Sequence, residues 1–330
     1  VATLIRRLAS SHAVLLIEHD IDRVLALSDR ITVLHQGRLI ADGLPAAVAH
    51  DPQVISAYLG DSGTAVAAPA RIARTDAASE PAQAIPTGRA LLQLEQVCAG
   101  YDGGTVLDGV DLTVYAGEVV ALLGRNGVGK TTLLRTITGT LHATAGRVNF
   151  DGRDVSAMRA DLINRLGISL VPEGRRLFPN LTVQDNLKIG ARDGGAPLDE
   201  ICELFPKLRV LMRSRAGNLS GGERQMVAIA RALMVPSSLI LLDEPFEGLA
   251  PAVVHEVREA VVKLTTRASL VIVEHHAQSV LTMADRAYGL VNGKVAFGGS
   301  AKELAADTAL QERLLGVTTA GPEERSRETA

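Results

Sequence analysis

A glycine-rich run at residues 124–132, GRNGVGKTT, constrains the fold of this chain more than any other segment. It fits the pattern GxxxxGK[ST] of a phosphate-binding loop. The run EVVALL at 118–123 predicts a strand before it, and the run TTLLRTIT at 131–138 predicts a helix after it. An ordinary glycine-rich turn is the alternative, and it is disfavoured because both flanking elements are present. Strand, loop and helix in this order predict an α/β domain that binds phosphate groups.

The residue types in this loop suit phosphate chemistry. The glycines let backbone N–H groups turn towards an anion, and the N-terminus of the helix adds a favourable dipole. Lys130 is predicted to reach the β- and γ-phosphates, and the Thr131 hydroxyl to ligate Mg²⁺. The loop residues predicted to contact a nucleotide are Gly124, Asn126, Gly127, Gly129, Lys130, Thr131 and Thr132.

A second motif is the run SLILLDEP at 238–245. Its four apolar residues, Leu239–Leu242, predict a buried parallel strand. Asp243 and Glu244 then stand at the carboxyl end of that strand, where α/β sheets place ligands. Asp243 would hold Mg²⁺ directly or through water, and Glu244 would orient or deprotonate an attacking water. Taken alone, a strand that ends in an acidic turn is an equal reading, but the phosphate loop favours the functional one.

A third motif is NLSGGERQ at 218–225, directly before the helical pattern MVAIARAL. Ser220, Gly221 and Gly222 offer a hydroxyl and backbone amides at a helix N-terminus, which predicts a second anion site. Ser220 and Glu223 also form the pattern of a capping box. The two readings coexist, because the cap would shape the site.

An internal repeat relates residues 14–60 to residues 270–316 at a constant offset of 256 positions. In this ungapped alignment 13 of 47 positions are identical, and they span Gly, charged and apolar types, which indicates one supersecondary unit present twice. Each copy predicts an apolar strand (Val14–Ile17 or Leu270–Val273), a helix, two short strands joined by a turn, and a small helical cap. The turns are expected at Gly37 and Gly293.

Composition bounds the remaining choices. The net charge of -3, an aromatic content of 3% and the lack of Trp disfavour binding to nucleic acid. Cys98 and Cys202 cannot form a disulfide framework, and no apolar run reaches the length of a membrane span. The Ala/Pro-rich stretch at 61–90 predicts a flexible linker, and residues 318–330 a disordered tail. Residues 91–317 then form one complete domain. Because the first residue is Val1, we expect a fragment or a processed product.

The order of phosphate loop, LSGGE, LLDEP and a following His275 resembles an ATP-binding cassette (ABC) ATPase over the whole of 91–317. The LSGGE run separates this family from other phosphate-loop enzymes. The runs VPEGRRLFPNLTVQDNL, ELFPKL and EGLAP are similar to the ATPase of branched-chain amino-acid importers of the LivF type. Residues 1–60, with IEHD and DPQVISAYLG, resemble the C-terminal end of the partner ATPase, the LivG type.

The resemblance implies a fold and a set of roles. The fold is an α/β phosphate-loop NTPase with a mixed sheet, a helical signature subdomain and an antiparallel β subdomain. Tyr101 would stack on adenine, although an ordinary edge-strand tyrosine is the alternative. Glu244 would be the catalytic base and His275 the switch histidine at the γ-phosphate. Glu173, where most of the family has Gln, would lie near the metal. Residues of the LSGGE run (Ser220, Gly221, Gly222 and Glu223) would complete the opposite subunit's ATP site, and Gly248–Ala250 would lie at the dimer seam.

The resemblance also implies cofactors, partners and location. ATP and Mg²⁺ would be the cofactors. The partners would be permease subunits, a second ATPase in a head-to-tail dimer and, indirectly, a periplasmic solute-binding protein, with no nucleic acid. The protein would lie on the cytoplasmic face of the inner membrane and power uptake of branched-chain amino acids or similar small polar solutes. His19 matches the switch position in a segment that lacks the other motifs. A soluble ABC-type ATPase that acts on nucleic acid or ribosomes, and a nonfunctional truncated fusion, remain the alternatives.

Overall fold

The structure is a computed structural model that describes residues 2–17, 24–25, 27–35, 38–49, 51, 53–54 and 88–315. The chain divides into two compact units, one of residues 1–68 with 248–256 and the other of residues 69–247 with 257–330. The predicted linker, apart from 88–90, and the predicted tail lie outside the described residues.

The larger unit is built on a six-stranded sheet in the order β12-β11-β5-β10-β9-β8. Its strands are β5 (Val119–Leu123), β8 (Ile168–Val171), β9 (Leu239–Asp243), β10 (Ser269–Glu274), β11 (Arg286–Val291) and β12 (Lys294–Ser300). All neighbours pair in parallel except β11 and β12, which form an antiparallel hairpin at one edge. Strands β5, β9 and β10 are buried along their whole length, as expected for parallel strands with both faces covered. This arrangement confirms the α/β class.

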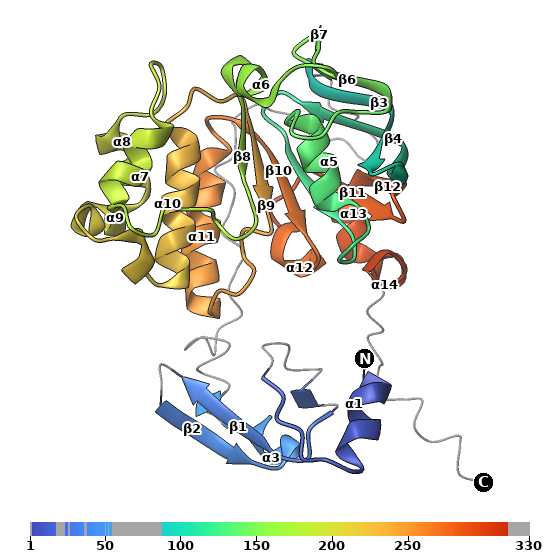
Figure 1. Cartoon of the computed structure of the whole chain (residues 1–330), viewed down its shortest axis with the longest axis vertical. Helices are drawn as coiled ribbons and strands as arrows, with labels where there is room; N and C mark the ends of the chain where they lie inside the picture. Colours follow the sequence, from blue (N-terminus) through green and yellow to red (C-terminus); the bar gives the residue numbers. More distant parts are fainter. Residues whose placement is uncertain are drawn as a thin grey trace. The chain divides into compact units, whose positions relative to one another are not determined.

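A second, antiparallel sheet has the order β4-β3-β6-β7. Its strands are β3 (Ala90–Tyr101), β4 (Gly104–Tyr115), β6 (Ala145–Phe150) and β7 (Arg153–Asp154). Figure 1 shows this sheet on one side of the six-stranded sheet, with α5 packed between the two. It is the expected antiparallel β subdomain.

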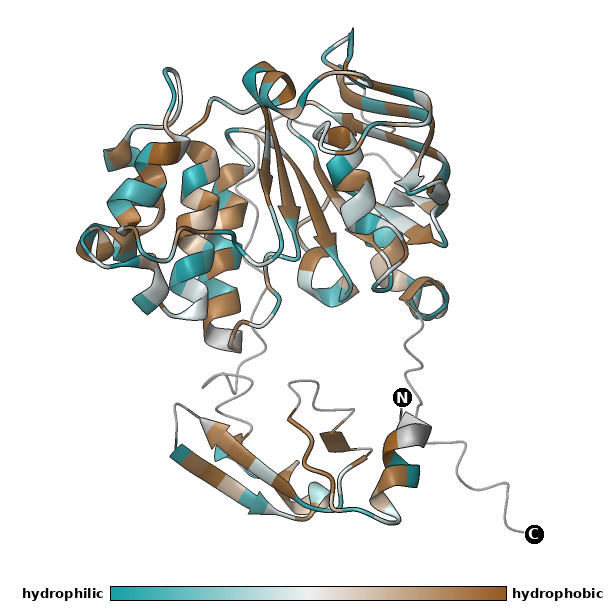
Figure 2. Ribbon diagram, in the orientation of Figure 1, coloured by the Kyte–Doolittle hydropathy of each residue, from teal (hydrophilic) through white to brown (hydrophobic). Residues whose placement is uncertain are grey.

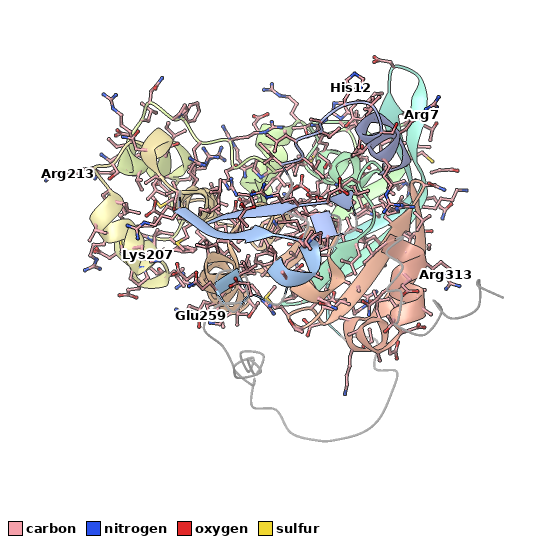
Figure 3. The ribbon with its side chains drawn as sticks, turned by 90° about the horizontal axis from the view of Figure 1, so that it is seen from below. Arg7, His12, Lys207, Arg213, Glu259 and Arg313 are labelled. Carbon is pink, nitrogen blue, oxygen red and sulfur yellow. The ribbon has the colours of Figure 1, made fainter. Side chains whose placement is uncertain are left out.

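Helices α7 to α10 form a separate lobe on the other side of the six-stranded sheet (Figure 1). They are α7 (Val183–Gly190), α8 (Leu198–Leu204), α9 (Pro206–Leu211) and α10 (Gly221–Leu233). In Figure 3 the labelled side chains of Lys207 and Arg213 lie at the outer rim of this lobe. The lobe is the expected helical subdomain, and it carries the LSGGE run at the start of its longest helix.

The remaining helices are shorter connections and caps, apart from α11. They are α5 (Lys130–Ile137), α6 (Ala160–Leu166), α11 (Pro251–Leu264), α12 (Ala277–Val280), α13 (Ala301–Ala306) and α14 (Thr308–Leu315). The predicted helix at 131–138 therefore begins one residue earlier, at Lys130. The helix predicted after His275 is only the short α12, and residues 281–283 after it form a turn.

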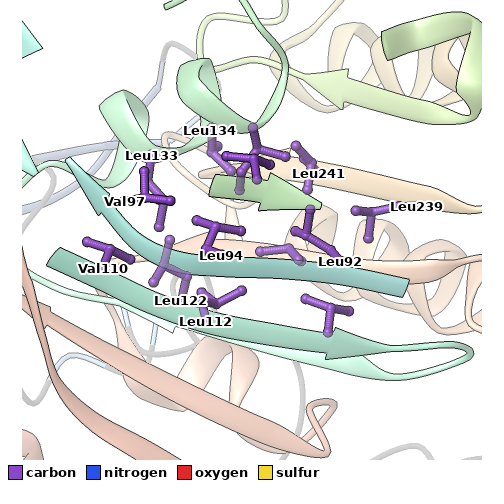
Figure 4. Packing of buried hydrophobic residues seen from close by; sticks show 14 of the residues in the cluster. Leu92, Leu94, Val97, Val110, Leu112, Leu122, Leu133, Leu134, Leu239 and Leu241 are labelled. Atoms are coloured by element: carbon purple, nitrogen blue, oxygen red, sulfur yellow. The ribbon is translucent and has the colours of Figure 1, made fainter. Parts of the chain in front are cut away.

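One apolar core joins the two sheets and α5. Figure 4 shows leucines of β3 and β4 packed against Leu133 and Leu134 of α5 and Leu241 of β9. Phe150 is 1% exposed and is the largest fully buried side chain. Figure 2 shows the same pattern by hydropathy, with apolar central strands and helices that are polar on their outer faces. This packing supports the carboxyl ends of β5, β9 and β10, where the predicted site residues stand.

The smaller unit contains α1 (Ala2–Ala9), the antiparallel pair β1 (Ile31–His35) and β2 (Arg38–Gly43), and α3 (Pro45–Val48). The pair and the helix correspond to β11, β12 and α13 of the second copy, which confirms the two predicted strands and the cap. The turn expected at Gly37 lies outside the described residues. The strand predicted at Val14–Ile17 is wrong, since residues 13–17 form no strand. Its counterpart Leu270–Val273 lies in β10 between β5 and β9, whereas Leu15 and Ile17 are each 90% exposed. A strand needs paired neighbours, and no described residue pairs with this segment.

Candidate functional site

The phosphate loop has the backbone that its glycines predict. Gly127 and Gly129 have φ values of 83° and 111°, in the left-handed region that favours glycine. A Cβ on Gly124 would lie 2.7 Å from the Leu290 carbonyl oxygen, so this position has no space for a larger side chain. The loop thus leads from buried β5 into the N-terminus of α5, the geometry of an anion site.

Lys130 is the first residue of α5, and it is only 5% exposed. Its Nζ donates to the carbonyl oxygens of Gly124 at 2.8 Å and Arg125 at 3.2 Å, and lies 3.4 Å from Asn126 Oδ1. It also lies 3.3 Å from Glu244 Oε1. A buried ammonium held by loop carbonyls is placed to bind phosphate oxygens, because those oxygens would compete for the same proton donors.

Thr131 and Asp243 come together although 112 residues separate them. Thr131 Oγ1 donates to Asp243 Oδ2 at 3.4 Å, and Asp243 Oδ1 is buried without a hydrogen-bond partner among the described residues. Burial, followed by the nearby carboxylates of Glu244 and Glu173, raises the pKa of Asp243 to about 6. A hydroxyl beside a buried carboxylate with an open oxygen fits Mg²⁺, which prefers oxygen ligands. Glu173 is exposed, and its charge contributes to the raised pKa of Asp243.

Glu244 follows β9 in a left-handed conformation, with φ 48°, which is unusual for a non-glycine residue and typical of functional sites. Its amide donates to the Val273 carbonyl at 3.0 Å, so β10 fixes this turn. Oε2 lies 3.6 Å from His275 Nδ1, an ion-pair distance rather than a hydrogen bond. The interaction with His275, and also the charge of Lys130, hold the pKa of Glu244 well below its ordinary value, while Glu244 raises the pKa of His275. The predicted base and switch histidine therefore contact one another.

Glu274 is a site residue that the sequence reasoning missed. It is the last residue of β10, it is 1% exposed, and its Oε1 accepts from the Phe246 amide at 3.3 Å. Burial raises the pKa of Glu274 to about 7. A carboxyl directly before His275 at the end of an apolar strand was the available signal. The hydrogen bond between the Phe246 amide and Glu274 joins the turn after Glu244 to the end of β10, directly before His275.

Tyr101 ends β3 and is 41% exposed, and its hydroxyl accepts a 3.0 Å hydrogen bond from Arg135 Nη1. Strand β3 lies between β4 and β6, so it is an inner strand of its sheet. The pairing with β6 ends at Cys98, however, whereas Tyr101 pairs with Gly104 of β4, so stacking on adenine and an ordinary edge-strand tyrosine both stay predictions for this position. An exposed ring whose hydroxyl is fixed by Arg135 of α5 is suited to stacking.

The LSGGE run begins α10, and its capping box is present. The Ser220 side chain accepts from the Glu223 amide, and the Glu223 carboxylate accepts from the Ser220 amide at 2.7 Å. The Ser220 hydroxyl is on an exposed residue, and Gly221 and Gly222 form the first turn. Helix α10 lies in the helical lobe, away from α5, the helix that begins at Lys130 (Figure 1). The structure therefore does not bring Ser220 to the phosphate loop of its own chain.

Gly248 and His19 are two further positions that the sequence analysis singled out. Gly248, in the segment expected at a dimer seam, has φ 65° and no atom within 4 Å of an added Cβ. His19 lies outside the described residues. Within those residues no helix is long and apolar enough to cross a membrane, and no cluster of three or more metal-ligating side chains occurs.

Two known protein families match parts of this chain. The family model described as "ABC transporter" matches residues 107–247, and that described as "Branched-chain amino acid ATP-binding cassette transporter" matches residues 38–64. The high-affinity branched-chain amino acid transport ATP-binding protein BraG of Pseudomonas aeruginosa is 38% identical over 232 residues, which cover 68% of this chain and 100% of BraG. The probable branched-chain amino acid transport ATP-binding protein LivF of Archaeoglobus fulgidus is 35% identical over 69% of this chain and 99% of LivF.

A solved structure of an ATP-binding cassette is similar to this chain in fold. The crystal structure of the ADP conformation of an ATP-binding cassette of an ABC transporter superposes with a TM-score of 0.60 at 30% identity, covering 69% of this chain and 100% of that one. Fold and site together define a nucleotide-binding phosphate-loop NTPase. The chain belongs to the ATP-binding proteins of ABC transporters. It is thus an ATP-hydrolysing transport ATPase.

Proposed function

We propose that this protein powers uptake of branched-chain amino acids or similar small polar solutes by hydrolysing ATP within a head-to-tail ATPase dimer. The observation that carries the proposal is the meeting of Lys130, Glu244 and His275 at the carboxyl ends of β5, β9 and β10. The names of BraG and LivF support the class of solute.

The residues at this site divide the work of phosphate transfer. Lys130 binds the β- and γ-phosphates together with amides of the phosphate loop. Phosphate oxygens compete with Glu244 for Lys130, and loss of that cation raises the pKa of Glu244. Glu244 then orients and deprotonates water more readily. His275, 3.6 Å from Glu244, holds this carboxylate and donates to the γ-phosphate.

Mg²⁺ fits the oxygen atoms of Thr131 and Asp243, with Glu173 close by. When bound, it would neutralise charge on the β- and γ-phosphates. The buried Asp243 oxygen without a partner supports this assignment.

The LSGGE run supports the dimer. Helix α10 lies in the helical lobe away from α5 (Figure 1), so the exposed Ser220 and the Gly221 and Gly222 amides are placed to meet the ATP of an opposite subunit. Tyr101 stacks on adenine on the near side. The second subunit is another copy of this chain or a LivG-like ATPase, and Gly248–Ala250 lies at the seam. ATP closes the dimer and hydrolysis reopens it.

The assembly sits on the cytoplasmic face of the inner membrane through its permease subunits, and a periplasmic solute-binding protein delivers the solute. Residues 1–60 are the C-terminal fragment of a LivG-like ATPase, joined by the linker at 61–90 to the complete cassette at 91–317, and 318–330 form a tail. The match of residues 38–64 to the branched-chain family model supports the first assignment. Limited proteolysis tests it: rapid loss of 1–90 from a resistant 91–317 core would make the first segment a passenger.

The central test is Glu244→Gln. It keeps the shape of the side chain and removes the base, so the variant should bind Mg-ATP, stop turning over and accumulate as a dimer. Gel filtration with ATP and a phosphate-release assay measure this. A monomer that still hydrolyses ATP would refute the assigned role. Uptake of radiolabelled leucine into proteoliposomes with the permeases, against urea and a simple amide, tests the solute.

A further inference from the structure

Three consecutive residues after Glu173 have left-handed backbone. Gly174, Arg175 and Arg176 have φ values of 73°, 65° and 42°. Glycine adopts this region readily, but two arginines in succession do so only when their surroundings hold them. Backbone of this kind persists where the surrounding contacts fix it, and it is concentrated at functional sites.

The Arg175 guanidinium bridges two segments that are distant in sequence. Its Nε donates to Gln225 Oε1 at 3.0 Å, and its Nη2 donates to the Glu247 carbonyl oxygen at 3.2 Å. Gln225 is 3% exposed and lies in α10, five residues after Ser220. The Glu247 amide in turn donates to the Glu244 carbonyl. The Arg175 side chain thus connects α10 to the turn that carries Glu244.

A second arginine holds the left-handed turn itself. Arg231, also in α10, donates from Nη1 to the Arg176 carbonyl at 3.0 Å and from Nη2 to the Arg175 carbonyl at 3.3 Å. Burial lowers the pKa of Arg231, and burial followed by the nearby Arg224 lowers that of Arg175. Both carbonyl oxygens of the left-handed turn therefore accept hydrogen bonds from one guanidinium of α10.

We propose that Arg175 is a positioning residue for ATP hydrolysis: its planar fork sets the distance between helix α10 and the Glu244–Glu247 turn, and Arg231 keeps it in the required conformation. A guanidinium suits this task because its donors point in fixed directions, so one side chain can satisfy two acceptors at once. The inference rests on the proposed function, since the helix that Arg175 holds presents Ser220 to the second ATP site.

The test compares Arg175→Met and Gln225→Met, singly and together, with the matched control Arg176→Met. The control removes the same charge from the next residue, which is exposed and contacts α10 through its carbonyl. Arg175→Met should lower kcat by about 10-fold and leave the Kd for ATP within about twofold, because Lys130 is untouched. The kcat of the double variant should be no lower than that of the more impaired single variant, since the two residues act as one unit.

Amide hydrogen exchange gives a second readout that needs no turnover. Exchange within residues 221–231 should rise about 10-fold in Arg175→Met and stay unchanged in Arg176→Met. Should Arg175→Met fail to fold by circular dichroism, Arg175→Lys, which keeps the charge but not the fork, is expected to show the same pattern.

Equal kcat and equal exchange in the Arg175 and Arg176 variants would overturn the proposal, and so would multiplicative losses in the double variant. If the wild-type chain neither binds nor hydrolyses ATP, the proposed function fails instead, while the exchange comparison still decides the role of Arg175.

Discussion

Glu274→Gln should change how stability depends on pH, because this buried carboxyl is neutral over much of the ordinary range. Burial raises its pKa from 4.5 to about 7. Between these values the folded chain keeps the proton and the unfolded chain releases it, so stability falls as pH rises. The difference of about 2.5 pKa units corresponds to about 3 kcal/mol lost between pH 4.5 and pH 7.

Glutamine has the same shape, keeps an oxygen for the Phe246 amide and does not titrate. The stability of Glu274→Gln relative to wild type should therefore rise by about 3 kcal/mol from pH 4.5 to pH 8. His275 and Asp243 also have raised pKa values, but they are present in both proteins and largely cancel in the difference.

Urea unfolding followed by circular dichroism, without nucleotide or Mg²⁺, measures this difference; the chain has no Trp for fluorescence. Glu95→Gln makes the same substitution at an exposed position of β3 and is the matched control. If the Glu274→Gln difference changes with pH no more than that of the control, the carboxyl is not held neutral and the reasoning is refuted.

Two further predictions concern the phosphate loop and the β subdomain. Lys130→Ala should raise the Kd for ATP at least about 100-fold, because it removes a charge-assisted contact of about 3 kcal/mol. A binding titration measures this, with Lys302→Ala at an exposed position as the control. Equal affinities of the two variants would count against the site. Gly146→Ala should destabilise the protein by several times as much as Gly152→Ala. Both glycines have positive φ, 80° and 76°, but a Cβ on Gly146 would lie 2.2 Å from the Gln96 carbonyl oxygen, whereas Gly152 has nothing within 4 Å. The Gly152 variant should then lose only about 1–2 kcal/mol of stability, which is the cost of the left-handed backbone; similar urea midpoints for both variants would contradict this.

Local spacing predicted the elements that carry the chemistry. The phosphate loop depends on glycine conformations within a few residues, so its strand and helix were placed to within one residue. The capping box of Ser220 and Glu223 is equally local, and it is present as predicted. The strand at Val14–Ile17 failed because a strand depends on neighbours that the local sequence does not contain.

What the sequence alone determined is therefore the set of short segments that bind phosphate, cap α10 and end β9 in two carboxylates, since each is specified by residues close along the chain. Only the tertiary structure decided which groups meet. The contact of Lys130 with Glu244, the burial of Glu274 and the bridge from Arg175 to Gln225 and Glu247 join distant segments. The physical reason is that burial and charge pairing depend on how the sheet and the helical lobe pack, and spacing along the chain does not encode that packing.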